Sequence, residues 1–145
     1  MIQQIMPEQV AYYWESIKDK VDETLPAIPG ESDKLNGILT SLLNGTMICW
    51  ISYRIVEERK KSNAFLITSI NHDHITGVKS LVLYCLYVMG RADMTAWKEG
   101  FEAIKRFGAS KGCTRLTAYT TNDFLVRMAN EFDGGADYHF ISIPI

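Results

Sequence analysis

Apolar residues recur every three or four positions in four stretches of the chain, and this spacing predicts four amphipathic helices. Pro7 fits the first turn of the first helix, and Ser32 or Asp33 can cap the second, which Asn44-Gly45 would end. The helices are expected over Glu8–Leu25, Asp33–Leu43, Thr95–Lys111 and Asp123–Phe132.

Short stretches rich in β-branched and aromatic residues separate these helices, and such stretches are typical of strands. The charged segment Glu57–Asn63 and the segment Asn71–Gly77 are expected to join the first three strands into an antiparallel meander. Leu81–Val88 is apolar on both alternations, which predicts the middle strand of a sheet covered on both faces. The strands are expected over Thr46–Val56, Ala64–Asn71, Ser80–Met89, Arg115–Thr121 and Tyr138–Ile145.

The predicted order of elements is therefore α, α, β, β, β, α, β, α, β, and no internal repeat interrupts it. This order indicates a mixed α/β fold, with a central and mostly antiparallel sheet and helices on both of its faces. We expect one domain over residues 1–145. Its parts are a helical segment 1–45, the three-strand meander 46–89 and an α-β-α-β half 90–145.

Charge and hydropathy exclude two classes of partner. The 145 residues include 15 Lys and Arg against 17 Asp and Glu, so a net charge of -2 gives no basic field that would attract nucleic acid. The longest apolar run, Leu81–Met89, has about half of the roughly 20 residues that a membrane-spanning helix needs. Met1–Met6 lacks the cationic start of a signal peptide. We expect a cytoplasmic protein that binds neither nucleic acid nor membrane.

Candidate metal ligands are few. The three cysteines, Cys49, Cys85 and Cys113, form no CxxC pair, so neither a disulfide framework nor a zinc site is indicated. In His72-Asp73-His74 two imidazoles could share one face of a strand, but no third ligand is evident and a solvated turn is the expectation. We predict no metal site.

The order of elements resembles that of the GNAT (Gcn5-related N-acetyltransferase) fold over nearly the whole chain. The segment 101–121, FEAIKRFGASKGCTRLTAYTT, resembles the GNAT stretch in which a helix ends in a glycine and runs into a strand. Asn122 stands where that family often has an asparagine that opens its last helix. The resemblance implies a GNAT-like fold, acetyl-CoA as cofactor and N-acyl transfer as the activity.

The loop that holds the cofactor diphosphate in that family has the pattern R/Q-x-x-G-x-G/A, because small residues let backbone amides approach the phosphates. The corresponding segment 88–97 reads VMGRADMTAW, in which the glycine precedes the arginine and Asp93 adds a negative charge. A helix cap is the expected role of Asp93. If CoA binds, the resemblance gives as its binding residues Val88, Gly90, Arg91 and Asn122.

The family often protonates the departing thiolate with a tyrosine about seven residues after that asparagine. Here the position falls at Met128 or Ala129, and the nearby tyrosines that could substitute are Tyr119 and Tyr138. A general base could come from the turns between strands, at Glu57, Glu58, His72, Asp73 or His74. The resemblance leaves the catalytic residues unknown.

The altered loop and the missing tyrosine predict a GNAT-fold protein that has lost acetyltransferase chemistry and needs no cofactor. Its expected role is structural, with other proteins of an assembly as partners. Small GNAT-like virion proteins of bacteriophages are similar in size, in the helical N-terminal third and in the altered loop, which would place the chain in a virion or the host cytoplasm. An apolar patch at Tyr12, Tyr13 or Trp14 would fit that role. The alternative is an active acetyl-CoA-dependent N-acyltransferase acting on an unknown amine.

Overall fold

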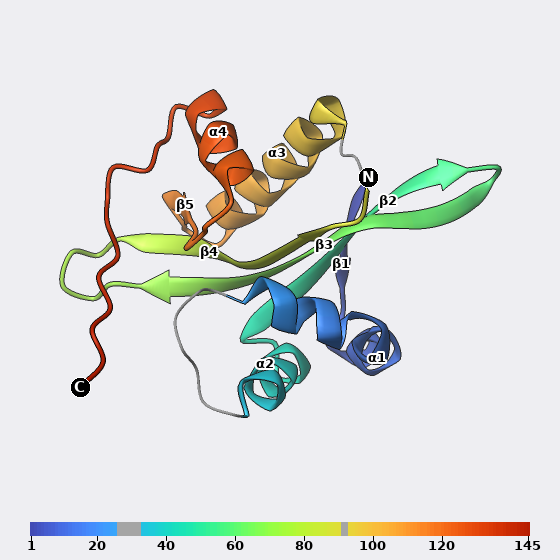
Figure 1. Ribbon diagram of the computed structural model, residues 1–145, viewed down its shortest axis with the longest axis horizontal. Coiled ribbons are helices and arrows are strands. Elements are labelled where there is room, and N and C mark those ends of the chain that lie inside the picture. The colour runs from blue at the N-terminus through green and yellow to red at the C-terminus, as the bar shows by residue number, and fades with distance from the viewer. Residues whose placement is uncertain (26–32, 91–92) are drawn as a thin grey trace.

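The structure is a computed structural model that describes residues 1–25, 33–90 and 93–145. Its strands form one five-stranded sheet in the order β1-β2-β3-β4-β5, with α1 and α2 on one face and α3 and α4 on the other (Figure 1). The elements are β1 (Ile2–Ile5), α1 (Pro7–Thr24), α2 (Lys34–Leu43), β2 (Met47–Val56), β3 (Arg59–His72), β4 (Lys79–Val88), α3 (Met94–Ser110), β5 (Arg115–Thr117) and α4 (Asp123–Glu131).

Strand pairing is antiparallel from β1 to β4 and parallel between β4 and β5. The mixed α/β fold with helices on both faces of a mostly antiparallel sheet is therefore confirmed. Within the described residues, no helix is both long enough and apolar enough to span a membrane.

The helices follow the apolar spacing closely. On α1 the buried side chains are three or four residues apart, at Val10, Trp14, Ile17 and Val21. On α2 the buried side chains are Ile38 and Leu42, and Gly45 ends this helix with a φ of +79°. Asp33 stands at the N-cap of α2 without a side-chain cap bond, whereas the other cap that we considered, Ser32, lies outside the described residues.

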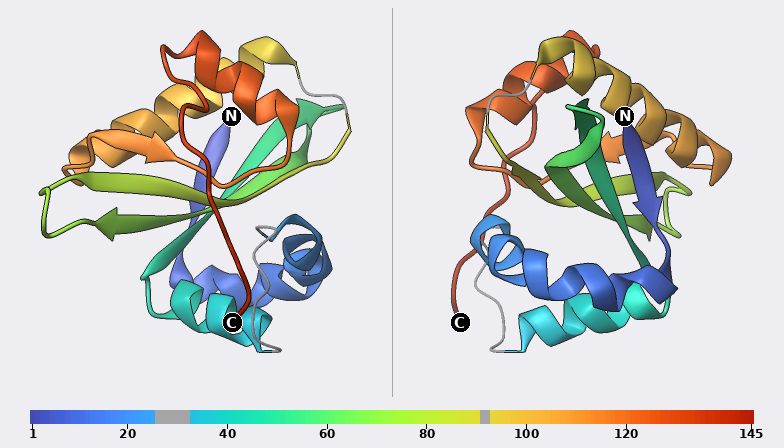
Figure 2. Two further views of the ribbon diagram at one scale, coloured as in Figure 1. Left: turned by 60° about the vertical axis from the view of Figure 1, so that its left-hand side comes forward. Right: turned by 90° about the vertical axis from the view of Figure 1, so that its right-hand side faces the viewer.

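Two strand predictions were wrong. The sequence Ile2–Ile5 has no apolar alternation and was not expected to form a strand, yet it pairs with β2 from Cys49 to Ser52 as β1. Tyr138–Ile145 was expected to close the sheet but forms no strand, and its large apolar side chains lie exposed. The chain end lies on the α1 and α2 side of the sheet, whereas α4 lies on the other side (Figure 2).

The position of β4 also differs from the prediction. The middle strand is β3, because β1 adds a strand beyond β2 and moves the centre of the sheet. Both faces of β4 are nevertheless covered, as its apolar pattern indicated. Leu81 and Leu83 pack in the cluster that includes Ile104 of α3, and Cys85 packs in the cluster that includes Val21 of α1.

The turn between β2 and β3 is tighter than expected, since β3 begins at Arg59 and only Glu57 and Glu58 remain in the connection. Both residues have left-handed backbone angles, with φ of 49° and 60°. This conformation costs an L-residue other than glycine about 1–2 kcal/mol.

We therefore expect the double substitution Glu57→Asn, Glu58→Gly to raise the free energy of unfolding by about 1 kcal/mol, because Asn-Gly is the preferred pair for such a turn. Urea denaturation measures the change. The control is Glu99→Gly on the exposed surface of α3, which should lower the stability by about 1 kcal/mol. An unchanged or lower stability of the double variant would contradict the turn geometry.

Candidate functional site: the cleft between β4 and β5

The two parallel strands β4 and β5 separate soon after they meet. They pair only through Ser80–Val82 of β4 and Arg115–Thr117 of β5. Beyond this point β4 continues to Val88, paired with β3 alone in the described residues. About half of the backbone groups of a strand point toward each neighbour, so N–H and C=O groups of β4 face the opening that β5 leaves.

This opening is a cleft of about 230 Å³, which we call the β4–β5 cleft. Its walls come from the end of α1, from β4, from the segment after β5 and from the start of α4. In chain order the lining residues are Glu23, Thr24, Leu25, Leu83, Tyr84, Leu86, Tyr119, Thr120, Thr121, Asn122 and Leu125. Among these residues Glu23 alone carries a formal charge.

A β-bulge shapes the β4 wall. Ile67 of β3 pairs with Cys85 and Thr68 pairs with Leu83, so Tyr84 is an extra residue without a partner. A bulge turns the side chains that follow it toward the opposite face of the sheet. Leu83 and Cys85 therefore pack on opposite faces although they are two residues apart, and Tyr84 borders the cleft.

Hydrogen bonds hold the wall opposite β4. The N–H of Asn122 donates to Oγ1 of Thr120 at 2.9 Å, and Oδ1 of Asn122 accepts from the N–H of Phe124 at 2.9 Å. Asn122 is thus the N-cap of α4, the helix that the resemblance places after this asparagine, and it also lines the cleft.

Of the other predicted cofactor residues, Val88 and Gly90 do not line the cleft with Asn122. Val88 lines a different cavity, under α3, and so does Asp93. Gly90 follows β4 with a φ of +82°, a conformation that suits glycine. Arg91 lies outside the described residues. Asp93 is the N-cap of α3, where its Oδ1 accepts from the N–H of Thr95 at 3.1 Å, so the predicted cap is confirmed.

Of the candidate proton donors, only one lines the cleft. Met128 stands at the sequence position where the resembled family often has a tyrosine, and it is buried in the core. Tyr138 is 84% exposed in the C-terminal segment and does not line the cleft, whereas Tyr119 does. The ring of Tyr119 also meets Phe140 edge to face, at 5.2 Å between ring centroids. Sequence reasoning missed Tyr84, because only the bulge distinguishes it from a packing residue.

The candidate bases lie in the two hairpin turns, outside the residues that line the cleft. Glu57 and Glu58 form the tip between β2 and β3. Asp73 is in the turn before β4, where the N–H of Ile75 and the hydroxyl of Thr76 lower the pKa of its carboxyl. The ring centroids of His72, the last residue of β3, and of His74 in the turn lie 4.3 Å apart. No group of three potential metal ligands occurs in the part of the chain that the structure describes.

Two thiols lie in the core and are unsuited to nucleophilic chemistry. Burial raises the pKa of Cys49 and of Cys85 to about 12, so both stay protonated at neutral pH. Cys113 is partly exposed but does not line the cleft. The chemistry that the cleft can perform therefore depends on hydroxyl groups, backbone amides and one carboxylate.

Comparisons with known proteins identify solved structures with the same fold but no protein that is related in sequence. Neither a scan against protein-family models nor a search of curated proteins found a match. Solved structures do match: an aminoglycoside N-acetyltransferase, AAC(6')-Iy, in complex with a CoA bisubstrate analogue, has a TM-score of 0.70 at 17% identity. The match covers 100% of this chain and 97% of that one.

Two further structures match over the whole chain. A ribosomal-protein-alanine N-acetyltransferase from Brucella melitensis biovar Abortus 2308 has a TM-score of 0.68 at 13% identity, with 99% of that chain covered. A probable acetyltransferase has a TM-score of 0.66 at 11% identity, with 98% covered. Both matches cover 100% of this chain, which therefore has the fold of the GNAT acetyltransferases.

Proposed function

We propose that the protein binds an acyl-CoA thioester in the β4–β5 cleft and transfers the acyl group to an amine. The observation that carries the proposal is the early separation of β4 from β5, which, among the described residues, leaves this edge of β4 without a partner strand along a cleft of about 230 Å³. The fold shared with acetyltransferases, one of them bound to a CoA bisubstrate analogue, adds support.

The cleft residues fit the pantetheine arm of such a thioester. The arm contains two amides, and the free backbone groups of β4 are suitable donors and acceptors for them. Among the described lining residues only Glu23 is charged, which suits an uncharged chain. At the N-terminus of α3, the carboxylate of Asp93 already accepts from the N–H of Thr95, and its negative charge disfavours an anionic diphosphate there. The described residues therefore suit the pantetheine arm better than the diphosphate.

Acyl transfer in the cleft would need few protein groups. The lone pair of a neutral amine forms a C–N bond with the thioester carbonyl carbon, and the C–S bond breaks as the sulfur leaves. The amine loses one proton, and the departing sulfur gains one to become a thiol. The hydroxyl of Tyr119 is the group that we assign to proton delivery, because it lines the cleft and remains open to solvent for reprotonation.

Calorimetric titration with acetyl-CoA tests the proposal. We expect saturable binding to the unmodified chain, and at least tenfold weaker binding to Thr121→Glu, since that variant places a negative charge in the cleft beside an anionic ligand. Thr117→Glu is the matched control, because Thr117 is exposed on β5 outside the cleft, and it should bind like the unmodified chain. No heat at millimolar acetyl-CoA would contradict the proposal.

A second candidate is a protein without catalytic activity that serves a structural role, for example in a bacteriophage particle. The observation that favours it is the C-terminal segment, whose exposed apolar side chains include Phe140, Ile141 and Ile143. On α1, Tyr12 is 83% exposed while Trp14 is in the core, so the predicted aromatic patch has one fully exposed member. The acetyl-CoA titration separates the two candidates, since this second role needs no cofactor.

A further inference from the structure

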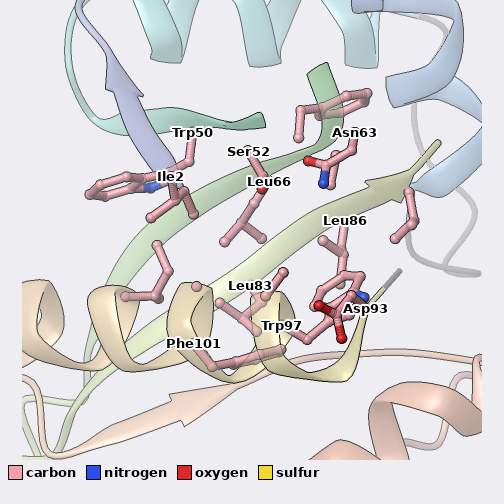
Figure 3. A pocket seen from close by; sticks show the side chains of 16 residues that line it. Ile2, Trp50, Ser52, Asn63, Leu66, Leu83, Leu86, Asp93, Trp97 and Phe101 are labelled. Atoms are coloured by element: carbon pink, nitrogen blue, oxygen red, sulfur yellow. The ribbon is translucent and has the colours of Figure 1, made fainter. Parts of the chain in front are cut away.

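A second cavity, of about 60 Å³, lies between α3 and the sheet, and we call it the α3 cavity (Figure 3). Its walls are mostly apolar and include Trp50, Leu66, Phe101 and Ile104. At about 30 Å³ for each water molecule in the liquid, this volume corresponds to about two groups of the size of a methylene, the length by which a four-carbon acyl chain exceeds acetyl.

Within the described residues, two buried polar atoms that lack a hydrogen-bond partner belong to residues that line the α3 cavity: Oδ1 of Asn63 and Nε1 of Trp97. Asn63 comes from β3 and Trp97 from α3 (Figure 3). Trp50 lines the same cavity but differs, because its Nε1 donates to Oγ1 of Thr68 at 3.0 Å. Buried polar groups are nearly always paired in folded proteins, so this acceptor and this donor, which no described residue pairs, are available to a bound ligand.

The position of Asn63 depends on a second bulge. Ser52 pairs with Ala64 and Tyr53 pairs with Ser62, which leaves Asn63 as the extra residue of β3. Its carbonyl oxygen accepts from the N–H of Met89 at 2.7 Å and fixes the backbone there. Bulges redirect a side chain at functional positions, and here the redirected side chain is the unpaired amide.

The α3 cavity adjoins the proposed site. Leu83 and Leu86 of β4 line both the α3 cavity and the β4–β5 cleft. A free molecule of only a few atoms gains little binding energy by itself, because affinity is limited by the number of non-hydrogen atoms. A group of this size would bind well if it were attached to a larger ligand held in the adjoining cleft.

We propose that the α3 cavity receives the acyl chain of the thioester, so that the preferred donor carries an acyl group of about four carbons with a hydroxyl group rather than acetyl. This inference rests on the proposed function. The chain passes between Leu83 and Leu86, and its hydroxyl group donates to Oδ1 of Asn63.

The test is calorimetric titration of the full chain with acetyl-CoA, butyryl-CoA and 3-hydroxybutyryl-CoA. Two additional buried methylene groups should make butyryl-CoA bind about tenfold tighter than acetyl-CoA. The hydroxyl group should add about a further threefold to tenfold in affinity, because it satisfies a buried polar atom. In Asn63→Leu the gain from the hydroxyl group should disappear.

Gly100 offers a way to fill the cavity, since it lines the α3 cavity and a Cβ there meets nothing within 4 Å. Gly100→Leu should reduce the affinity for butyryl-CoA to that for acetyl-CoA, and Gly100→Ala should reduce the preference in part. The matched control is Gly37→Leu, at a helical glycine of α2 that is equally open, and it should keep the preference. Thermal unfolding verifies that each variant is folded.

The outcomes separate this inference from the proposed function. Equal affinities for acetyl-CoA and butyryl-CoA, or a preference that survives Gly100→Leu in a folded variant, would overturn the acyl-chain assignment while leaving the proposed function intact. If none of the three thioesters binds, both proposals fall. If the preference for butyryl-CoA is reduced in the Gly100 variants and kept in Gly37→Leu, the result supports the assignment.

Discussion

Tyr119→Phe is expected to lower kcat for acetyl transfer to an amine by about 100-fold or more, the usual contribution of a positioned general acid. The substitution removes only the hydroxyl group and keeps the ring that meets Phe140 edge to face. The thioester should therefore still bind, and the loss should appear in kcat rather than in the Kd for acetyl-CoA. Single-turnover kinetics and calorimetry measure the two quantities.

The matched control is Tyr138→Phe. Tyr138 is highly exposed, lies outside the cleft and should contribute nothing to the rate. Tyr84→Phe gives a second comparison, since that ring lines the opposite wall and packs against the core cluster. If Tyr119→Phe keeps the full rate and Tyr84→Phe loses it, the proton donor is on β4 and our assignment of Tyr119 is wrong.

Ile67→Ala is expected to lower the free energy of unfolding by about 2–5 kcal/mol. Ile67 is completely buried on β3, the middle strand, beside the bulge at Tyr84. Truncating its side chain removes buried apolar area and leaves a cavity that close-packed neighbours refill only in part. Chemical denaturation with urea, monitored by tryptophan fluorescence, gives the change.

The control uses the same substitution at a solvated position. Ile75 is 95% exposed in the turn before β4, so Ile75→Ala should change the stability by no more than about 0.5 kcal/mol. A similar small change at Ile67 would mean that the middle of the sheet is not packed as described. A large loss of stability in Ile75→Ala alone would mean that Ile75 is packed and not exposed.

The local features were the most predictable from sequence. Helix spacing is a property of the chain itself, and Asp93 was predicted as a cap because a short polar side chain before an apolar helix satisfies free N–H groups. Strand β1 was missed because IQQI carries no alternation, and its pairing with β2 decides its conformation. Tyr138–Ile145 has the composition of a strand but no neighbouring strand in the described residues.

The candidate site was only partly predictable. Asn122 was identified from a resemblance, and Tyr119 was considered as a substitute for the missing family tyrosine. Val88 was predicted as a cofactor residue from the resemblance, and its place in the lining of the α3 cavity depends on the packing of α3 on the sheet, which has no local pattern in the sequence. Tyr84 and Asn63 gained their importance from two such bulges, each of which depends on the pairing register of neighbouring strands.

By itself, the sequence determined four helices, most of the strands and a mixed α/β fold, because apolar periodicity and capping act over a few residues. The tertiary structure alone decided the places of β1 and β5 in the sheet, the bulges and the separation of β4 from β5 after Val82. These features depend on contacts between residues far apart in the chain, and such contacts leave no local pattern. The cleft and the α3 cavity follow from them, and so does the chemistry that we assign to this protein.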